Sequence, residues 1–193
     1  MALAVVTSRS LDGLDSPEVQ VEVHLANGLP TFTLVGLADI EVKEARERVR
    51  AALTNSGFAF PTNKRITVSL APADLPKESG RFDLPIALGI LAADAQLDSE
   101  RLSRHEFEGE LSLAGELRPV RGALALALAL RRQGAPRALV LPTASARGGI
   151  GARRGRARGR SPAAGGARDV PRRRRAGATR SRDAASDGRR AIA

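Results

Sequence analysis

The chain has 193 residues, contains no cysteine and carries a formal net charge of +10. This length fits one ordinary domain with further chain beside it, and the lack of cysteine excludes disulfides, thiolate metal sites and thiol redox chemistry. The charge is uneven, because residues 1–146 hold 16 Lys and Arg against 18 Asp and Glu, whereas residues 147–193 hold 15 Arg against 3 Asp. Any purely electrostatic nucleic-acid binding therefore belongs to the C-terminal segment.

The N-terminal residues predict a strand and no targeting segment. Only five apolar residues, 2–6, precede Thr7, which is too short for a signal peptide or a membrane span, so we expect a cytoplasmic protein that does not associate with membranes. Residues 18–25 alternate apolar and polar side chains, which predicts a strand with one buried face. After the turn sequence at 27–30, residues 31–35 are predicted to form its antiparallel partner.

The next element is an amphipathic helix. Asp39 is expected as its N-cap, apolar residues recur at helical spacing from Val42 to Leu53, and Gly57 is expected to end it. The outer face carries charges of both signs, which favours solvation and local ion pairing over a dedicated anion site. Those charges are Lys43, Glu44, Arg46, Glu47, Arg48 and Arg50.

A second alternating segment, Ile66 to Leu70, predicts another strand, and the Pro- and Gly-rich residues 71–80 predict a loop. Asp83 is expected to cap a largely buried helix that contains the apolar run 86–93. The remaining elements are a hairpin from 107–113 and 117–120, a Leu/Ala helix over 122–132 and a strand over 137–141.

These elements predict an α+β layered domain over residues 1–145. Residues 146–193 are dominated by Arg, Ala and Gly and lack apolar periodicity, so we expect a disordered basic tail. The domain and the tail therefore call for separate functional hypotheses.

Several segments of the predicted domain carry a family resemblance. They are Val-Gly-Leu-Ala-Asp at 35–39, the helix at 42–53, Leu-Ala-Pro-Ala-Asp-Leu-Pro-Lys-Glu at 70–78, Gly-Arg-Phe-Asp-Leu-Pro-Ile-Ala-Leu at 80–88 and Gly-Glu-Leu-Ser-Leu at 109–113. Together they resemble the N-terminal, Lon-protease-like part of the ComM/YifB family of Mg-chelatase-like AAA+ ATPases. The resemblance implies a layered fold like the Lon proteolytic domain and domain 2 of ribosomal protein S5. It also implies hexamers that act in DNA branch migration during natural transformation, and no insertion of magnesium into porphyrin.

Two departures from the family limit what this chain can do. A nucleotide-binding loop of the form Gly-x-x-x-x-Gly-Lys-Ser/Thr is absent, so we expect neither ATP nor Mg²⁺ as a cofactor here, only in full-length relatives. The resemblance also stops near Ser145, and Arg, Ala, Gly and Pro are residues of GC-rich codons. We hypothesise that 147–193 is an out-of-frame translation, which reading the gene in its other frames would test.

A Lon-type peptidase needs a serine activated by a lysine. The resemblance places Asp83 at the nucleophile position and Leu124 at the lysine position, so both members of the pair are missing and the chain is predicted not to be an enzyme. Ser79 is the nearby hydroxyl, but no lysine follows to activate it. Besides capping a helix, Asp83 could face a neighbouring subunit.

The leading hypothesis is thus a non-catalytic domain of a ComM/YifB-like motor. The alternative is a small nucleic-acid-binding protein that acts through its Arg-rich tail, in which case deleting 147–193 would abolish salt-dependent DNA binding. Within the domain, the candidate contacts to DNA or to another subunit are Lys64, Arg65, Lys77 and Arg81, with loop charges in water as the simpler interpretation.

The remaining polar residues predict no site. His24 and His105 lack a second ligand at metal-binding spacing, so we expect no metal centre. Glu108 and Glu110 alternate on one strand and are expected to lie on its outward face.

Overall fold

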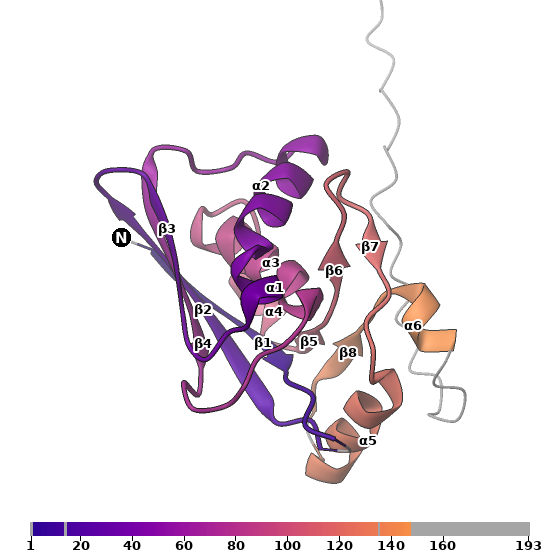
Figure 1. The fold of residues 1–193 in the computed structure, drawn as a ribbon. Coiled ribbons are helices and arrows are strands. Elements are labelled where there is room, and N and C mark those ends of the chain that lie inside the picture. The colour runs from indigo at the N-terminus through magenta and orange to yellow at the C-terminus, as the bar shows by residue number, and fades with distance from the viewer. Residues whose placement is uncertain (1, 14, 135, 148–193) are drawn as a thin grey trace, which may run out of the picture. The chain divides into compact units, whose positions relative to one another are not determined.

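The computed structural model describes residues 2–13, 15–134 and 136–147. The predicted basic tail, apart from its first residues, lies outside this range, so its predicted disorder is not addressed by the structure. The described part mixes helices and strands in two layers, as expected from the sequence: a sheet, and helices packed on one of its faces (Figure 1).

The main sheet is mixed, with three parallel and two antiparallel neighbour pairs. Its strands, in spatial order, are β3 (Thr31–Val35), β4 (Lys64–Ala71), β2 (Glu18–Asn27), β1 (Ala2–Arg9), β5 (His105–Phe107) and β8 (Ala138–Val140). The alternation predicted for residues 18–25 is confirmed, because Val19, Val21, Val23 and Leu25 are all buried.

The predicted pairing of residues 31–35 with β2 is wrong. Strand β3 does run opposite to β2, but β4 lies between them and pairs antiparallel with β2 and parallel with β3. The three residues between the strands allow the last Cα of β2 and the first Cα of β3 to lie about 13 Å apart, over four extended Cα–Cα steps. This distance exceeds two strand spacings of about 4.8 Å each. The short turn therefore lets β3 pass beyond β2, and the eight-residue β2–β4 ladder occupies the position between them.

The predicted helix over 41–56 is present but interrupted. It forms α1 (Ile40–Lys43) and α2 (Ala45–Asn55), separated at Glu44. Asp39 is confirmed as the N-cap, because its Oδ1 accepts a hydrogen bond of 2.8 Å from the Val42 backbone N–H. Gly57, at φ 81°, follows the end of α2 in the left-handed conformation that glycine adopts readily.

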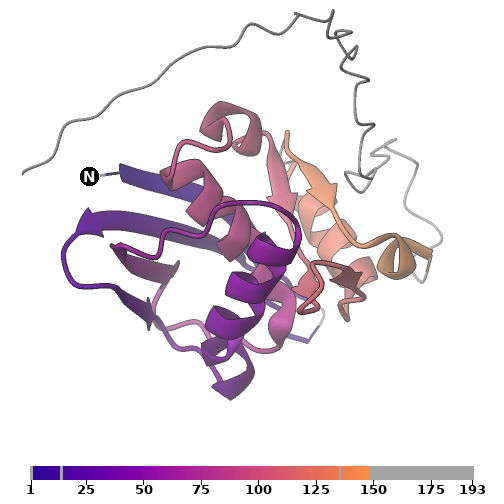
Figure 2. The same cartoon turned by 90° about the horizontal axis from the view of Figure 1, so that it is seen from above.

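Helix α3 (Asp83–Ala93) packs against β1 and β2, and α2 packs against α3. From above, these helices lie along one face of the strands (Figure 2). The core between the layers contains Val21 and Val23 from the sheet, Ile86 and Ile90 from α3, and Phe82, which precedes α3. All five side chains are fully buried. Gly89 allows this packing, since a Cβ there would lie 2.6 Å from the Val23 side chain.

The C-terminal part of the described chain completes the domain. The remaining elements are η1 (Gly80–Phe82), α4 (Ser99–Leu102), β6 (Glu110–Leu111), β7 (Leu117–Arg118), α5 (Ala123–Gln133) and α6 (Thr143–Arg147). The predicted hairpin is confirmed only in its inner part, as β6 and β7, because Phe107 belongs to β5 of the main sheet. The predicted helix and last strand are confirmed as α5 and β8, with slightly different bounds. None of the helices in the described ranges is long and apolar enough to cross a membrane.

Candidate functional site

The position that the family resemblance assigns to a hydrolytic nucleophile holds an ion pair inside the domain. The Asp83 side chain is fully buried at the start of α3, and Arg48 reaches it from α2. Arg48 Nε donates to Asp83 Oδ2 at 2.7 Å and its Nη2 donates to Oδ1 at 3.1 Å, the two-bonded geometry that guanidinium and carboxylate groups favour. The Leu111 backbone N–H also donates to Oδ2, at 3.2 Å.

This arrangement corrects the sequence interpretation of Asp83. The carboxylate does not cap α3, whose N-cap residue is Phe82 with no side-chain cap, and it faces Arg48 inside the domain, not a neighbouring subunit. Burial raises the pKa of Asp83, while Arg48 and the Leu111 N–H oppose that rise. The hydrogen bond to Asp83 raises the pKa of Arg48. Asp83 thus links α2, α3 and β6, and no hydroxyl occupies its place.

The position that the family resemblance assigns to a dyad lysine holds Leu124. Leu124 lies on α5 and is 50% exposed. Ser79 has a positive φ of 67°, and its Oγ accepts a hydrogen bond of 3.3 Å from Arg81 Nε. Lys77 donates its Nζ proton to the Pro72 carbonyl. Within the described ranges, no hydrogen bond joins a serine hydroxyl to a lysine ammonium group.

Two of the four candidate nucleic-acid contacts are buried. Lys77 is 0% exposed and Arg81 is 4% exposed, so neither side chain reaches the surface where DNA would bind. Desolvation lowers the pKa of Lys77. Lys64 and Arg65 lie at the start of β4, where Lys64 is half-buried and Arg65 is exposed. Successive strand residues point to opposite faces of the sheet. The surface candidates are therefore Lys64 on the helix side and Arg65 on the open side.

A second ionic cluster lies where the end of β1, the middle of β5 and the residue before β8 come together. Arg9 Nε donates to Glu106 Oε2 at 2.5 Å, and both side chains are fully buried. Arg137 Nε lies 3.2 Å from Glu106 Oε1. Sequence reasoning missed this cluster, because its members stand far apart in the chain and alternate with apolar residues as surface charges do.

Glu108 belongs to the same region, and its predicted outward orientation is wrong. Its carboxylate is fully buried, since β5 is an inner strand of the sheet and η1 covers the end where Glu108 lies. Oε1 accepts hydrogen bonds from Arg9 N at 2.5 Å and Ser8 Oγ at 3.0 Å, whereas Oε2 lies 3.7 Å from Arg81 Nη1 without a hydrogen bond. Burial raises the pKa of Glu108 to about 8. Glu110 is only half-buried and pairs with Arg118 at 3.1 Å.

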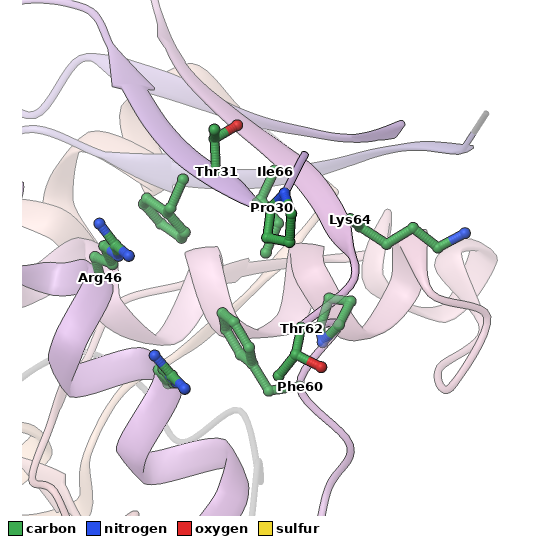
Figure 3. Close-up of a pocket in the computed structure, with 10 residues that line it drawn as sticks. Pro30, Thr31, Arg46, Phe60, Thr62, Lys64 and Ile66 are labelled. Atoms are coloured by element: carbon green, nitrogen blue, oxygen red, sulfur yellow. The ribbon is translucent and has the colours of Figure 1, made fainter. Parts of the chain in front are cut away.

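An open groove lies on the other side of α2. Its rim is formed by Arg46 and Arg50 from α2 and by Lys64 from β4, and the aromatic rings of Phe32 and Phe60 line it. Figure 3 shows the Phe60 ring between the helix that carries Arg46 and the strand that carries Lys64. The groove differs from the two ionic clusters in having cations and apolar surface but no carboxylate among its lining residues.

In the described ranges, no group of three His, Asp or Glu side chains is placed to hold a metal ion. His105 Nδ1 instead lies 3.0 Å from the Arg101 carbonyl oxygen, and His24 is half-buried on β2.

Comparison with known proteins gives a consistent result. The family model described as "Subunit ChlI of Mg-chelatase" matches residues 21–145. The chain is 58% identical over 132 residues to competence protein ComM of Haemophilus influenzae, which covers 68% of this chain and 26% of that protein. It is 53% identical over 134 residues to the uncharacterized protein YifB of Salmonella typhimurium, with 69% and 26% covered. It is 43% identical over 157 residues to an uncharacterized protein of Mycobacterium tuberculosis, with 79% and 31% covered. The chain thus spans about a quarter to a third of the length of these relatives.

Proposed function

This chain belongs to the family of subunit ChlI of Mg-chelatase, and from that premise we propose that it is the non-catalytic N-terminal domain of a ComM/YifB-like AAA+ ATPase. The single observation that carries the proposal is the 58% identity to competence protein ComM over 132 residues. In this proposal the domain adopts the Lon- and ribosomal-S5-like fold and works within a cytoplasmic hexamer that moves DNA branches during transformation. ATP and Mg²⁺ act on the motor, for which these 193 residues contain no nucleotide-binding loop.

The geometry supports a scaffold in preference to a hydrolase. A serine nucleophile must lie within hydrogen-bond reach of its base. Here the nucleophile position holds Asp83 bound to Arg48, and the base position holds the apolar Leu124. The Arg48–Asp83 ion pair connects α2 to α3, so the position of the nucleophile has a structural role in this chain.

A chimaera tests this proposal. The N-terminal domain of the Haemophilus influenzae ComM protein is replaced by residues 1–145 of this chain, and natural transformation is measured in cells that lack the native protein. We expect the chimaera to restore transformation, while the motor without any N-terminal domain does not.

A chimaera that assembles and hydrolyses ATP like the native ComM protein but leaves transformation at the level of the deletion would overturn the proposal. Peptide hydrolysis by the intact chain would contradict the non-catalytic part of it separately.

A further inference from the structure

The groove beside α2 combines aromatic side chains with cationic ones. Phe32 and Phe60 are half-buried. Both side chains pack against the core and also line the groove. The chain has only five phenylalanines and no tyrosine or tryptophan, so two of its five aromatic residues apart from histidine lie at this one place. Arg50 lies over the Phe60 ring, with its guanidinium carbon 5.9 Å from the ring centroid.

Among the described residues, one exposed carboxylate, that of Glu47, forms an ion pair with the cations of the rim. Arg46 and Arg50 are four residues apart on α2 and so lie on one face, a spacing at which like charges repel. Arg46 contacts Glu47 at 3.4 Å, but both side chains are at least half exposed and such a pair is weak. Lys64 donates to the neutral Asn27 Oδ1 at 2.9 Å. The groove therefore favours an anionic occupant.

The apolar floor narrows the class of anion. Inorganic phosphate would use the cations but leave the phenyl rings in water, and a DNA duplex keeps its base faces stacked inside the helix. A single strand offers both parts, since its phosphates can contact the rim while an unstacked base lies on an aromatic ring, with an arginine nearby to strengthen the contact.

We propose that this groove binds single-stranded DNA, with a base stacked on Phe60 and the adjoining phosphates contacted by Arg46, Arg50 and Lys64. The proposal rests on the proposed function in its choice of DNA over RNA. It assigns to the domain a contact with the unpaired strand that branch migration exposes.

The chain itself provides a clean reporter, because it contains no tryptophan. In the full-length chain, Phe60→Trp places the sole tryptophan in the groove, and oligo(dT) stacked on it should quench its fluorescence. Thr62→Trp, on an exposed residue of the same groove, provides a second reporter if the first variant does not fold. Leu128→Trp, on the partly exposed α5 that contributes nothing to the groove, is the control and should not be quenched.

The charge requirement is tested in the Phe60→Trp chain. Changing Arg46, Arg50 and Lys64 to Gln should weaken the quenching titration and reduce its salt dependence by a slope of about 2, at about 0.7 per lost single-strand phosphate contact. The matched control removes the same amount of charge elsewhere, through Arg101→Gln, Arg104→Gln and Arg131→Gln. It should leave the quenching titration of the tryptophan at position 60 unchanged. Because both triple variants keep residues 147–193 intact, the tail arginines cannot produce the difference.

Equal titrations for the two triple variants would overturn the proposal, as would equal quenching by duplex DNA. Stronger quenching by oligo(rU) would assign the groove to RNA, and equal quenching by an acidic peptide would assign it to a protein partner, either of which overturns the choice of single-stranded DNA. Thermal unfolding by circular dichroism confirms that each variant is folded. A failure here is distinct from failure of the chimaera, which measures transformation whatever the groove binds.

Discussion

Helix α2 presents arginines to two different regions, and the comparison shows how context assigns a role to one residue type. Arg48 points toward α3 and forms a bidentate ion pair with the buried carboxylate of Asp83. Arg46 and Arg50 point toward the groove, where no lining residue carries a negative charge. The first region pairs its cation with a buried carboxylate, while the ion pair of the second is the exposed one between Arg46 and Glu47.

The largest expected effect comes from breaking the complete region. Arg48→Met leaves the buried Asp83 carboxylate without its cation, which should lower the free energy of unfolding by about 4 kcal/mol, within the range for a broken buried ion pair. Urea denaturation followed by circular dichroism measures it. Arg48→Met combined with Asp83→Leu removes both charges and should recover much of the loss. A single variant as stable as the native chain would show that the pair is not structural.

A pH titration of stability sharpens the contrast between Asp83 and Glu108, whose Oε2 has a nearby guanidinium but no hydrogen bond. The native pKa of Glu108 is about 8 against an ordinary 4.5, so the folded state keeps a proton that the unfolded chain releases. This contribution to stability is therefore greatest at low pH and is lost as the pH rises from about 5 to 8, by about 3 kcal/mol.

Glu108→Gln isolates that contribution, because Gln can still accept the bonds from Ser8 and the Arg9 N–H but does not titrate. The difference in unfolding free energy between variant and native chain, measured at several pH values, should grow in favour of the variant up to pH 8. A difference that stays constant with pH would mean that Glu108 does not hold a raised pKa.

The groove should behave in the opposite way to the Arg48 region. Arg46→Gln with Arg50→Gln removes a like-charge repulsion and a cation–π contact, both small and opposed, so the free energy of unfolding should change by no more than about 0.5 kcal/mol. Thermal or urea unfolding checks this value. A loss comparable to that of Arg48→Met would make these arginines structural too.

The smallest expected effect concerns Ser79, whose hydroxyl lacks a lysine partner. A fluorophosphonate probe should leave the chain unlabelled under conditions that label a Lon-type serine peptidase. Labelling that disappears in Ser79→Ala would reveal a nucleophile that the hydrogen-bond pattern does not provide.

Much of the fold could be predicted from local patterns. The alternation in β2, the cap at Asp39 and the Leu/Ala helix α5 each depend on neighbours in sequence, and each is confirmed. The partner of β3 could not be predicted in the same way, because strand order depends on competition with β4, which lies about thirty residues further along the chain.

The sites were harder to predict for the same physical reason. Asp83 stands before an apolar run as a helix cap would, and only the approach of Arg48, 35 residues away, makes it an ion-pair partner. Glu108 alternates with apolar residues as an outward side chain would, but it follows the inner strand β5 and its side chain is fully buried. The mixed charges of α2 looked suited to solvation because the sequence does not show that Lys64 and Phe60 lie across from Arg46 and Arg50.

The different roles of the three α2 arginines are tested most directly by an oligo(dT) titration of three single variants, Arg46→Gln, Arg48→Gln and Arg50→Gln. Each is made in the Phe60→Trp chain and measured at a temperature where all three are folded. We predict that the variants at 46 and 50 bind the strand more weakly, while the variant at 48 binds like its parent. Equal losses at all three positions, or a loss at 48 alone, would contradict the assignment of one arginine to structure and two to a ligand.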